Sequence, residues 1–166
     1  LEQSLRLRGN EFSFRQTFTE ATISYKVTEG LKILLPVRYA IFEEKIKRRI
    51  SFGGSYKHKL NDYTFSYKSR IQRVYEKNKD LDELIRNKYT LQYKSNKDIE
   101  PFCSYEMFNP FSSDIGKMNE YRISFGVEID LPKKKSAKIF YLYKVENLSK
   151  KNPEILNVVG LSLSLN

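Results

Sequence analysis

The residues of this sequence with the most reactive side chains are its one histidine, His58, its one cysteine, Cys103, and the glutamates Glu106 and Glu128. A lipid hydrolase would need a serine nucleophile, a histidine base and a group that orients the base. His58 is the only such base, and it lies beside a predicted tight turn, away from the longer loops. We therefore expect no catalytic residue, with a lipid-modifying enzyme as an alternative.

The same inventory gives no cofactor or metal site. One cysteine excludes an internal disulfide, and one histidine excludes the usual Cys/His metal clusters. The pair Gly53 and Gly54 lies inside a predicted strand, where glycine indicates a bulge or close packing and not a phosphate loop. Glu106 and Glu128 face lysines and arginines in the pattern below, so we assign them no catalytic role.

The elements that would position these residues are strands, because apolar and polar residues alternate along most of the chain. The clearest segment is 121–131, where six apolar residues occupy one face and polar residues or glycine occupy the other. Similar segments predict about ten strands. Their ranges are 1–8, 20–27, 31–42, 49–60, 63–75, 88–94, 100–108, 121–131, 137–147 and 155–166. The sequence therefore predicts one all-β domain over residues 1–166.

The predicted connections alternate in length. Tight turns are expected at 29–30, 61–62 and 96–98, an intermediate one at 132–136, and longer loops at 8–13, 43–47, 77–83, 112–119 and 149–154. This rhythm is typical of an up-and-down transmembrane β-barrel of the bacterial outer membrane, with short periplasmic turns, longer extracellular loops and both termini in the periplasm. No signal peptide opens the sequence, so we expect an exported protein to be represented in its mature or trimmed form.

The tyrosines decide which face of the barrel is outside. All 12 tyrosines fall on the apolar face of their predicted strands. A tyrosine at a bilayer interface keeps its ring in the acyl region and its hydroxyl among the headgroups, whereas a buried hydroxyl would need a partner. We therefore predict a lipid-facing girdle formed by Tyr25, Tyr39, Tyr56, Tyr63, Tyr75, Tyr93, Tyr105 and Tyr143. A soluble lipocalin-like barrel, with the tyrosines inside, is an alternative.

The opposite face carries charges of both signs and would line the lumen. In a barrel of this size, side chains fill the interior, so paired charges predict a plug and not a channel. The predicted network consists of Arg38, Arg49, Lys68, Arg70, Glu100, Glu106, Arg122, Glu128 and Lys144.

The net charge of +10 raises nucleic acid as a partner. The basic residues, however, are spread over the lumen and both rims, so we predict no nucleic-acid binding. Cations near the longer loops could instead contact lipopolysaccharide phosphates, and we expect Arg48, Arg73, Lys150 and Lys151 to do so.

The C-terminal half, from about Tyr89 to Asn166, resembles a Bacteroidota family of small outer-membrane barrels described only as a domain of unknown function. The resemblance is carried by segments 89–94, 101–108 and 119–126 and by the final strand, 159–165. It implies the barrel and its compartment, and brings no catalytic residues. The chain ends on Leu165 and Asn166, where such barrels often have a terminal phenylalanine, so we expect either a different assembly signal or a trimmed end.

These observations favour a non-catalytic accessory or scaffolding subunit that contacts outer-membrane lipids, including lipopolysaccharide, and other outer-membrane proteins. A narrow pore for ions or small solutes is the first alternative.

Overall fold

The computed structural model describes residues 2–8, 13–77, 82–95, 98–111, 118–132 and 135–165. They form ten strands: β1 (Glu2–Arg8), β2 (Ser13–Lys26), β3 (Leu31–Phe42), β4 (Ile46–Leu60), β5 (Tyr63–Glu76), β6 (Asp82–Tyr93), β7 (Ile99–Pro110), β8 (Glu120–Leu131), β9 (Lys135–Glu146) and β10 (Glu154–Leu165). The predicted all-β class is confirmed. No helix suited to crossing a membrane occurs in these ranges.

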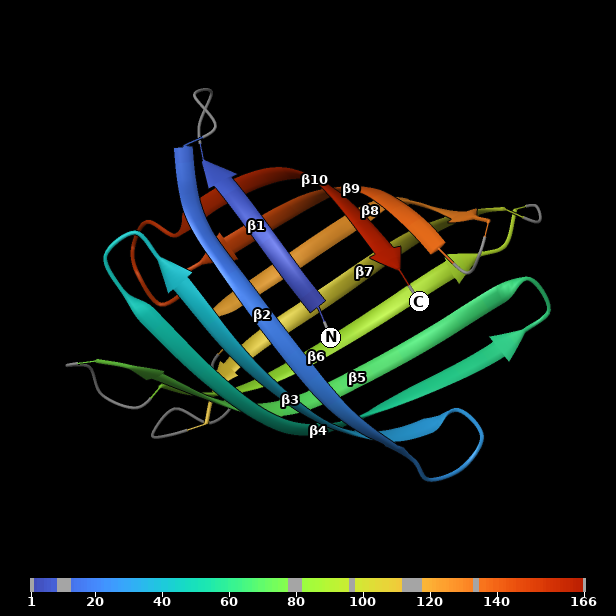
Figure 1. The fold of residues 1–166 in the computed structure, drawn as a ribbon, viewed down its shortest axis with the longest axis horizontal. Coiled ribbons are helices and arrows are strands. Elements are labelled where there is room, and N and C mark those ends of the chain that lie inside the picture. Colours follow the sequence, from blue (N-terminus) through green and yellow to red (C-terminus); the bar gives the residue numbers. More distant parts are fainter. Residues whose placement is uncertain are drawn as a thin grey trace.

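The strands form one antiparallel sheet in which each strand pairs with its neighbour in sequence, from β1 to β10. The sheet curls into an open barrel (Figure 1). Connections β3–β4 and β9–β10 lie at the left of this view, which we call the loop end, and β2–β3 and β4–β5 lie at the right, which we call the turn end. The predicted up-and-down topology is therefore confirmed. Parts of five predicted connections, at 9–12, 78–81, 96–97, 112–117 and 133–134, lie outside the described residues.

The two edge strands leave a seam in the wall. Strand β1 pairs with β2 from Glu2, opposite Glu20, to Arg8, opposite Ser13. Residues 21–26 of β2 therefore extend beyond β1 toward the turn end. Among the described residues no ladder joins β1 to β10, so the barrel is open along this seam.

Side chains alternate between the two faces of the sheet. In β3, Leu34 and Ala40 are buried, whereas Leu35, Val37 and Tyr39 between them are exposed. The buried set points into the concave side, because inward side chains of strands that are not neighbours touch one another there, as described below. The outer face is therefore apolar and the interior polar, as the sequence predicts.

Three strands begin three or more residues earlier than the sequence predicts. Strand β2 begins at Ser13 and not at residue 20, β4 begins at Ile46 and not at 49, and β6 begins at Asp82 and not at 88. The interior is itself a mixture of charges and apolar groups, such as inward-facing Phe18 and Leu84, so alternation is blurred in these segments. The hairpin between β3 and β4 is consequently tighter than predicted.

Gly30 and Asn61 allow two of the turn-end connections to form, and Gly53 allows strands β4 and β5 to pack closely. Gly30 and Asn61 adopt left-handed backbone conformations with φ of 82° and 52°, which allow the chain to reverse. Gly53 packs so closely against Ser69 and Arg70 of β5 that a Cβ atom would collide with their backbone. Of the predicted bulge or close packing at the glycine pair, close packing is found at Gly53, whereas a Cβ atom on Gly54 would make only an ordinary contact.

Candidate functional site

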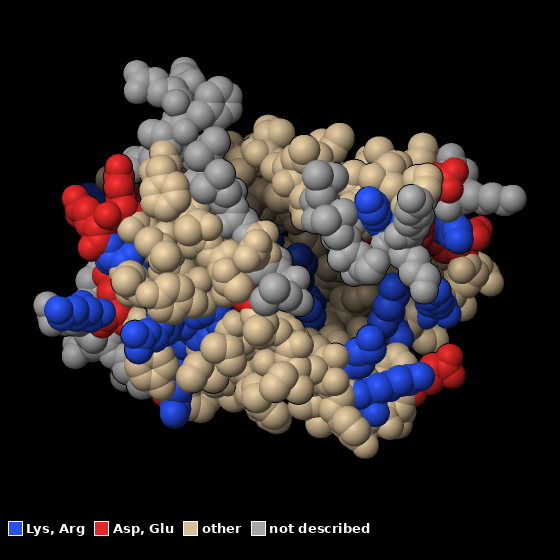
Figure 2. Space-filling view, viewed as in Figure 1, with Lys and Arg blue, Asp and Glu red and all other residues tan. Residues whose placement is uncertain are grey.

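The candidate site is the interior of the open barrel, where most charged side chains with ion-pair partners lie. Seen through the seam, the centre of the molecule is hollowed, and lysine and arginine side chains appear inside the hollow (Figure 2). The interior divides into a half near the loop end and a half near the turn end, which differ in how their charges are neutralised.

Glu20 is the centre of the first ion-paired cluster. Its side chain is only 8% exposed, and its Oε2 accepts hydrogen bonds from Arg38 Nε at 2.6 Å and Arg49 Nη2 at 2.7 Å. Arg70 reaches the other carboxylate oxygen at 3.9 Å from β5. The Arg38 guanidinium also lies 3.7 Å from the centre of the Phe18 ring. One carboxylate thus ties together β2, β3, β4 and β5 across the concave face.

A second ion-paired cluster lies on strands β6 to β9. Arg86 Nε donates to Glu106, whose side chain is 5% exposed. The guanidinium groups of Arg86 and Arg122 lie over the Phe108 ring, at 5.2 and 4.4 Å from its centre. Arg122 also donates to Glu120 at 2.5 Å, and Lys144 binds both Glu120 and Glu146. We call these two clusters together the ion-paired half.

The structure brings most of the predicted network together through carboxylates that the prediction did not include. Arg38, Arg49 and Arg70 meet on Glu20, and Arg122 and Lys144 meet on Glu120. Glu106 pairs with Arg86, which precedes the start predicted for its strand at 88, and Glu120 precedes the start predicted at 121. Extending the alternation past these starts would have found both residues.

The remaining members of the network behave differently. Glu128 accepts hydrogen bonds from Lys138 at 2.8 Å, Ser136 at 3.0 Å and Gln92 at 3.3 Å, so it is bound separately from Glu106. Lys68 and Glu100 form no ion pair with another described residue. The expected continuous network is therefore divided.

The turn half of the interior contains a cavity of about 980 Å³. Lysines provide most of its charged lining, and Glu29 of the β2–β3 connection is the carboxylate among its lining residues. The predicted plug is thus wrong for this half, because cations here greatly outnumber acids and cannot pair across the lumen.

The predicted girdle tyrosines all project from the outer face. The rings of Tyr63 and Tyr93 lie 5.0 Å apart toward the turn end, and Tyr121 lies between Tyr105 and Tyr143, about 6 Å from each, toward the loop end. Tyr25, Tyr39, Tyr56 and Tyr75 are also exposed. Their contact with lipid stays a prediction.

The predicted lipopolysaccharide contacts lie at the loop end. Arg48 is on the outer face of β4, where Tyr39 and Tyr75 flank it in the neighbouring strands. Arg73 pairs with Glu83 at 2.5 Å, and Lys150 lies 3.7 Å from Glu154 in the exposed β9–β10 connection, next to Lys151. They form a rim of cations around the ends of the strands.

His58 lies at the turn end of β4, and its ring stacks on Tyr56 with centres 6.3 Å apart. No group of three His, Cys, Asp or Glu side chains that could hold a metal ion occurs in the described ranges.

Residues 1–154 match the model of the family described as "Protein of unknown function (DUF2490)". The chain belongs to this family. The origin in Bacteroidota implied by the resemblance stays a prediction. No curated protein matches the chain in sequence.

Two solved structures share the fold. One is described as a bacterial polysaccharide outer membrane secretin, with a TM-score of 0.64 and 10% identity over 89% of this chain and 55% of that chain. The other is the NanC porin, with a TM-score of 0.61 and 14% identity over 90% of this chain and 79% of that chain. This chain thus spans about half the length of the secretin. At these identities the likeness establishes the fold alone.

Proposed function

We propose that this chain is an integral outer-membrane β-barrel that forms a narrow pore for small solutes. The observation that carries the proposal is the inversion of polarity across the sheet. Charged and polar side chains line the concave face, whereas the convex face exposes apolar residues such as Ile23, Phe52 and Phe125. A soluble lipocalin-like barrel requires the opposite arrangement, since its core is apolar. A lipid-facing wall around a polar lumen is the arrangement of outer-membrane barrels.

The ion-paired half would be the constriction of this pore. In this half Ser51, Gln72 and Arg70 each have a buried polar atom with no hydrogen-bond partner among the described residues. Buried polar atoms are usually satisfied by protein or by water. A hydrated path through the constriction would satisfy them, and it would join the cavity at the turn end to the loop end.

Planar-bilayer recordings of the purified protein test the pore. We expect discrete conductance steps that grow when the constriction is weakened in Glu20→Gln, because this change releases three arginines from their shared anion. Glu29→Gln, at the mouth of the cavity, is the matched control and should leave the step size nearly unchanged. Folded, lipid-inserted protein without any steps would contradict the pore.

The accessory role expected from the sequence is the second candidate, and the seam favours it. Membrane-spanning strands must have their backbone groups bonded within protein. The edge of β10 has no partner strand among the described residues, and Val159 on this strand is 80% exposed. A strand of another outer-membrane protein would bond this edge and cover its apolar side chains.

A photocrosslinking amino acid at Val159 in living cells distinguishes this role. A discrete adduct with another outer-membrane protein is expected from Val159, and none from the same group at Ile50, which is exposed on the far wall. Equal crosslinking at both positions would contradict a specific partner at the seam.

We further propose that the loop end faces outward and the termini face the periplasm. In this orientation Arg48, Arg73, Lys150 and Lys151 reach lipopolysaccharide phosphates, and the cavity opens toward the periplasm. The lengths of the connections support this orientation, because outer-membrane barrels carry their longer loops outside, and 147–153 at the loop end is longer than 61–62 at the turn end. Protease added to intact cells should cut within 147–153 and spare 61–62.

A further inference from the structure

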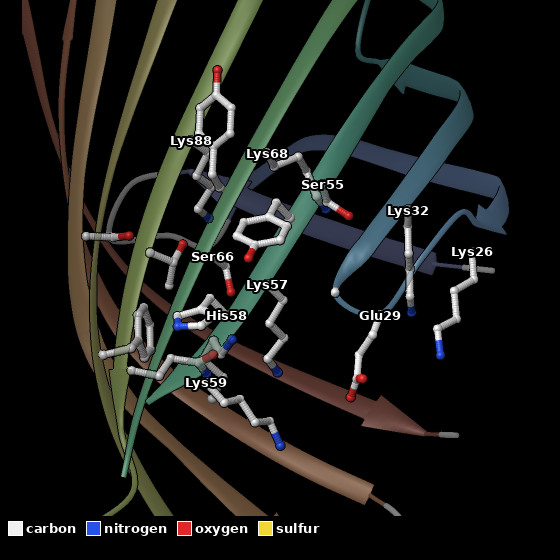
Figure 3. A pocket seen from close by; sticks show the side chains of 18 of the residues that line it. Lys26, Glu29, Lys32, Ser55, Lys57, His58, Lys59, Ser66, Lys68 and Lys88 are labelled. Carbon is white, nitrogen blue, oxygen red and sulfur yellow. The ribbon is translucent and has the colours of Figure 1, made fainter. Parts of the chain in front are cut away.

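The cavity at the turn end has a lining charge of one sign. Figure 3 shows Lys26, Lys32, Lys57 and Lys59 extending in the same direction from three strands, with Lys68 and Lys88 farther along β5 and β6. We call the cavity bounded by these six lysines and Lys138 the lysine vestibule.

Among the residues that the structure describes, most of these lysines have no ion-pair partner. Lys138 binds Glu128 at 2.8 Å, whereas the other six form no ion pair with a described carboxylate. This differs from the ion-paired half, where every inward arginine of the two clusters touches a glutamate. Positive charge is therefore concentrated in the lysine vestibule, whereas in the ion-paired half glutamates neutralise it.

Hydroxyl groups lie among the lysines at regular positions of the ladder. Lys68 stands between Ser55 on β4 and Lys88 on β6 in register. Two ladder positions nearer the turn end, at the next inward-facing position, Ser66 stands between Lys57 and Thr90. Ammonium and hydroxyl groups are hydrogen-bond donors to the oxygens of carboxylates and phosphates, and ammonium groups do so with charge assistance. The wall of the vestibule therefore offers a lattice of donors.

Confinement strengthens this positive field. Charges of one sign in a cleft with low-dielectric walls focus the potential and raise the local concentration of counter-ions. Several separated lysines suit a ligand that carries several separated negative charges, because one monovalent ion can neutralise only a part of the cluster. The volume of about 980 Å³ is that of a site for a sizeable organic molecule.

We propose that the lysine vestibule is a binding site for polyanions, namely small organic molecules with two or more carboxylate or phosphate groups. This inference names the solute class of the proposed pore, yet binding at the vestibule does not require that the pore conducts. Lys57, Lys59, Lys68 and Lys88 are the residues that hold the anion, with Ser55, Ser66 and Thr90 as hydroxyl donors.

Calorimetric titration of the detergent-solubilised chain with inositol hexakisphosphate tests the site. The double variant Lys57→Gln/Lys59→Gln should weaken binding at least about tenfold, because each loses a charge-assisted contact. Lys45→Gln/Lys47→Gln removes the same charge at the loop end, where both lysines pair with Glu76, and is the matched control, with unchanged affinity expected. Neutral inositol should not bind. If both double variants weaken the binding of inositol hexakisphosphate equally, or if neither weakens it, the vestibule is not the polyanion site.

Recordings of the same preparations separate this inference from the pore. Block of the conductance by inositol hexakisphosphate, relieved in Lys57→Gln/Lys59→Gln, supports the vestibule. Calorimetric binding that depends on Lys57 and Lys59 in a protein without conductance keeps the vestibule and removes the pore. The opposite result is a protein that conducts, does not bind the polyanion and is not blocked by it. That result overturns polyanion binding at the vestibule and leaves the pore.

Discussion

The two halves of the interior both carry cationic side chains, but they differ in whether carboxylates neutralise them. In the ion-paired half, Glu20 and Glu106 gather arginines into buried clusters that fasten several strands to one another. In the lysine vestibule, six of the seven lysines have no ion-pair partner among the described residues, and they line an open volume. The difference teaches that charge inside a barrel is structural where it is paired and available to a ligand where it is not. Four predictions test this contrast.

The largest effect should follow from breaking the first cluster. Glu20→Gln leaves Arg38, Arg49 and Arg70 buried without their anion, and removing one partner of a buried pair costs roughly 3–5 kcal/mol. Urea unfolding in lipid vesicles should show this loss for Glu20→Gln. The same change at exposed Glu29 should alter the unfolding free energy by less than about 0.5 kcal/mol. Equal losses would mean that the halves do not differ in this way.

A double-mutant cycle measures the contribution of a single pair. For Arg86→Ala and Glu106→Ala we expect a coupling free energy of about 1.5–3 kcal/mol, as for buried hydrogen bonds to charged groups. Arg73 and Glu83 form an equally close pair on the outer face, but the Arg73 side chain is 57% exposed. Their coupling should stay below about 1 kcal/mol. A larger coupling outside than inside would contradict the structural role of the ion-paired half.

Ionic strength should separate the halves without mutation. The Debye length falls from about 10 Å at 0.1 M salt to about 3 Å at 1 M, so charges in an open hollow are screened and buried pairs are screened much less. The reversal potential should show a preference for chloride over potassium at 0.1 M that disappears at 1 M. The unfolding free energy should change little over the same range. Selectivity that persists at 1 M would place its origin in the constriction.

The smallest effect concerns the loop-end rim. Arg48→Ala should weaken association with vesicles that contain lipopolysaccharide by about 1 kcal/mol, the value of one cation near an anionic surface. Arg73→Ala should have a smaller effect, since Glu83 already neutralises Arg73. Partition between vesicles with and without lipopolysaccharide measures both. Identical partition of wild type and Arg48→Ala would remove Arg48 from the contacts.

Much of the fold could be predicted from period-two alternation, because this pattern is contained in the sequence of each strand and does not depend on distant residues. The strand count, the antiparallel order and the outward tyrosines follow from it. The early starts of β2 and β6 could not be predicted as easily, since inward Phe18 and Leu84 place apolar groups on the polar face. The same boundary error removed Arg86 from the predicted network.

The sequence by itself determined that the chain forms a meander of strands with an apolar face and a charged face. Only the tertiary structure decided how the charges are distributed within the interior. Pairing between Glu20 on β2 and Arg70 on β5 depends on the curvature of the sheet, which brings distant strands within reach of one another. No local pattern encodes that distance. The charge pairing predicted for the whole lumen is therefore concentrated in one half, and the other half is a lysine-lined cavity.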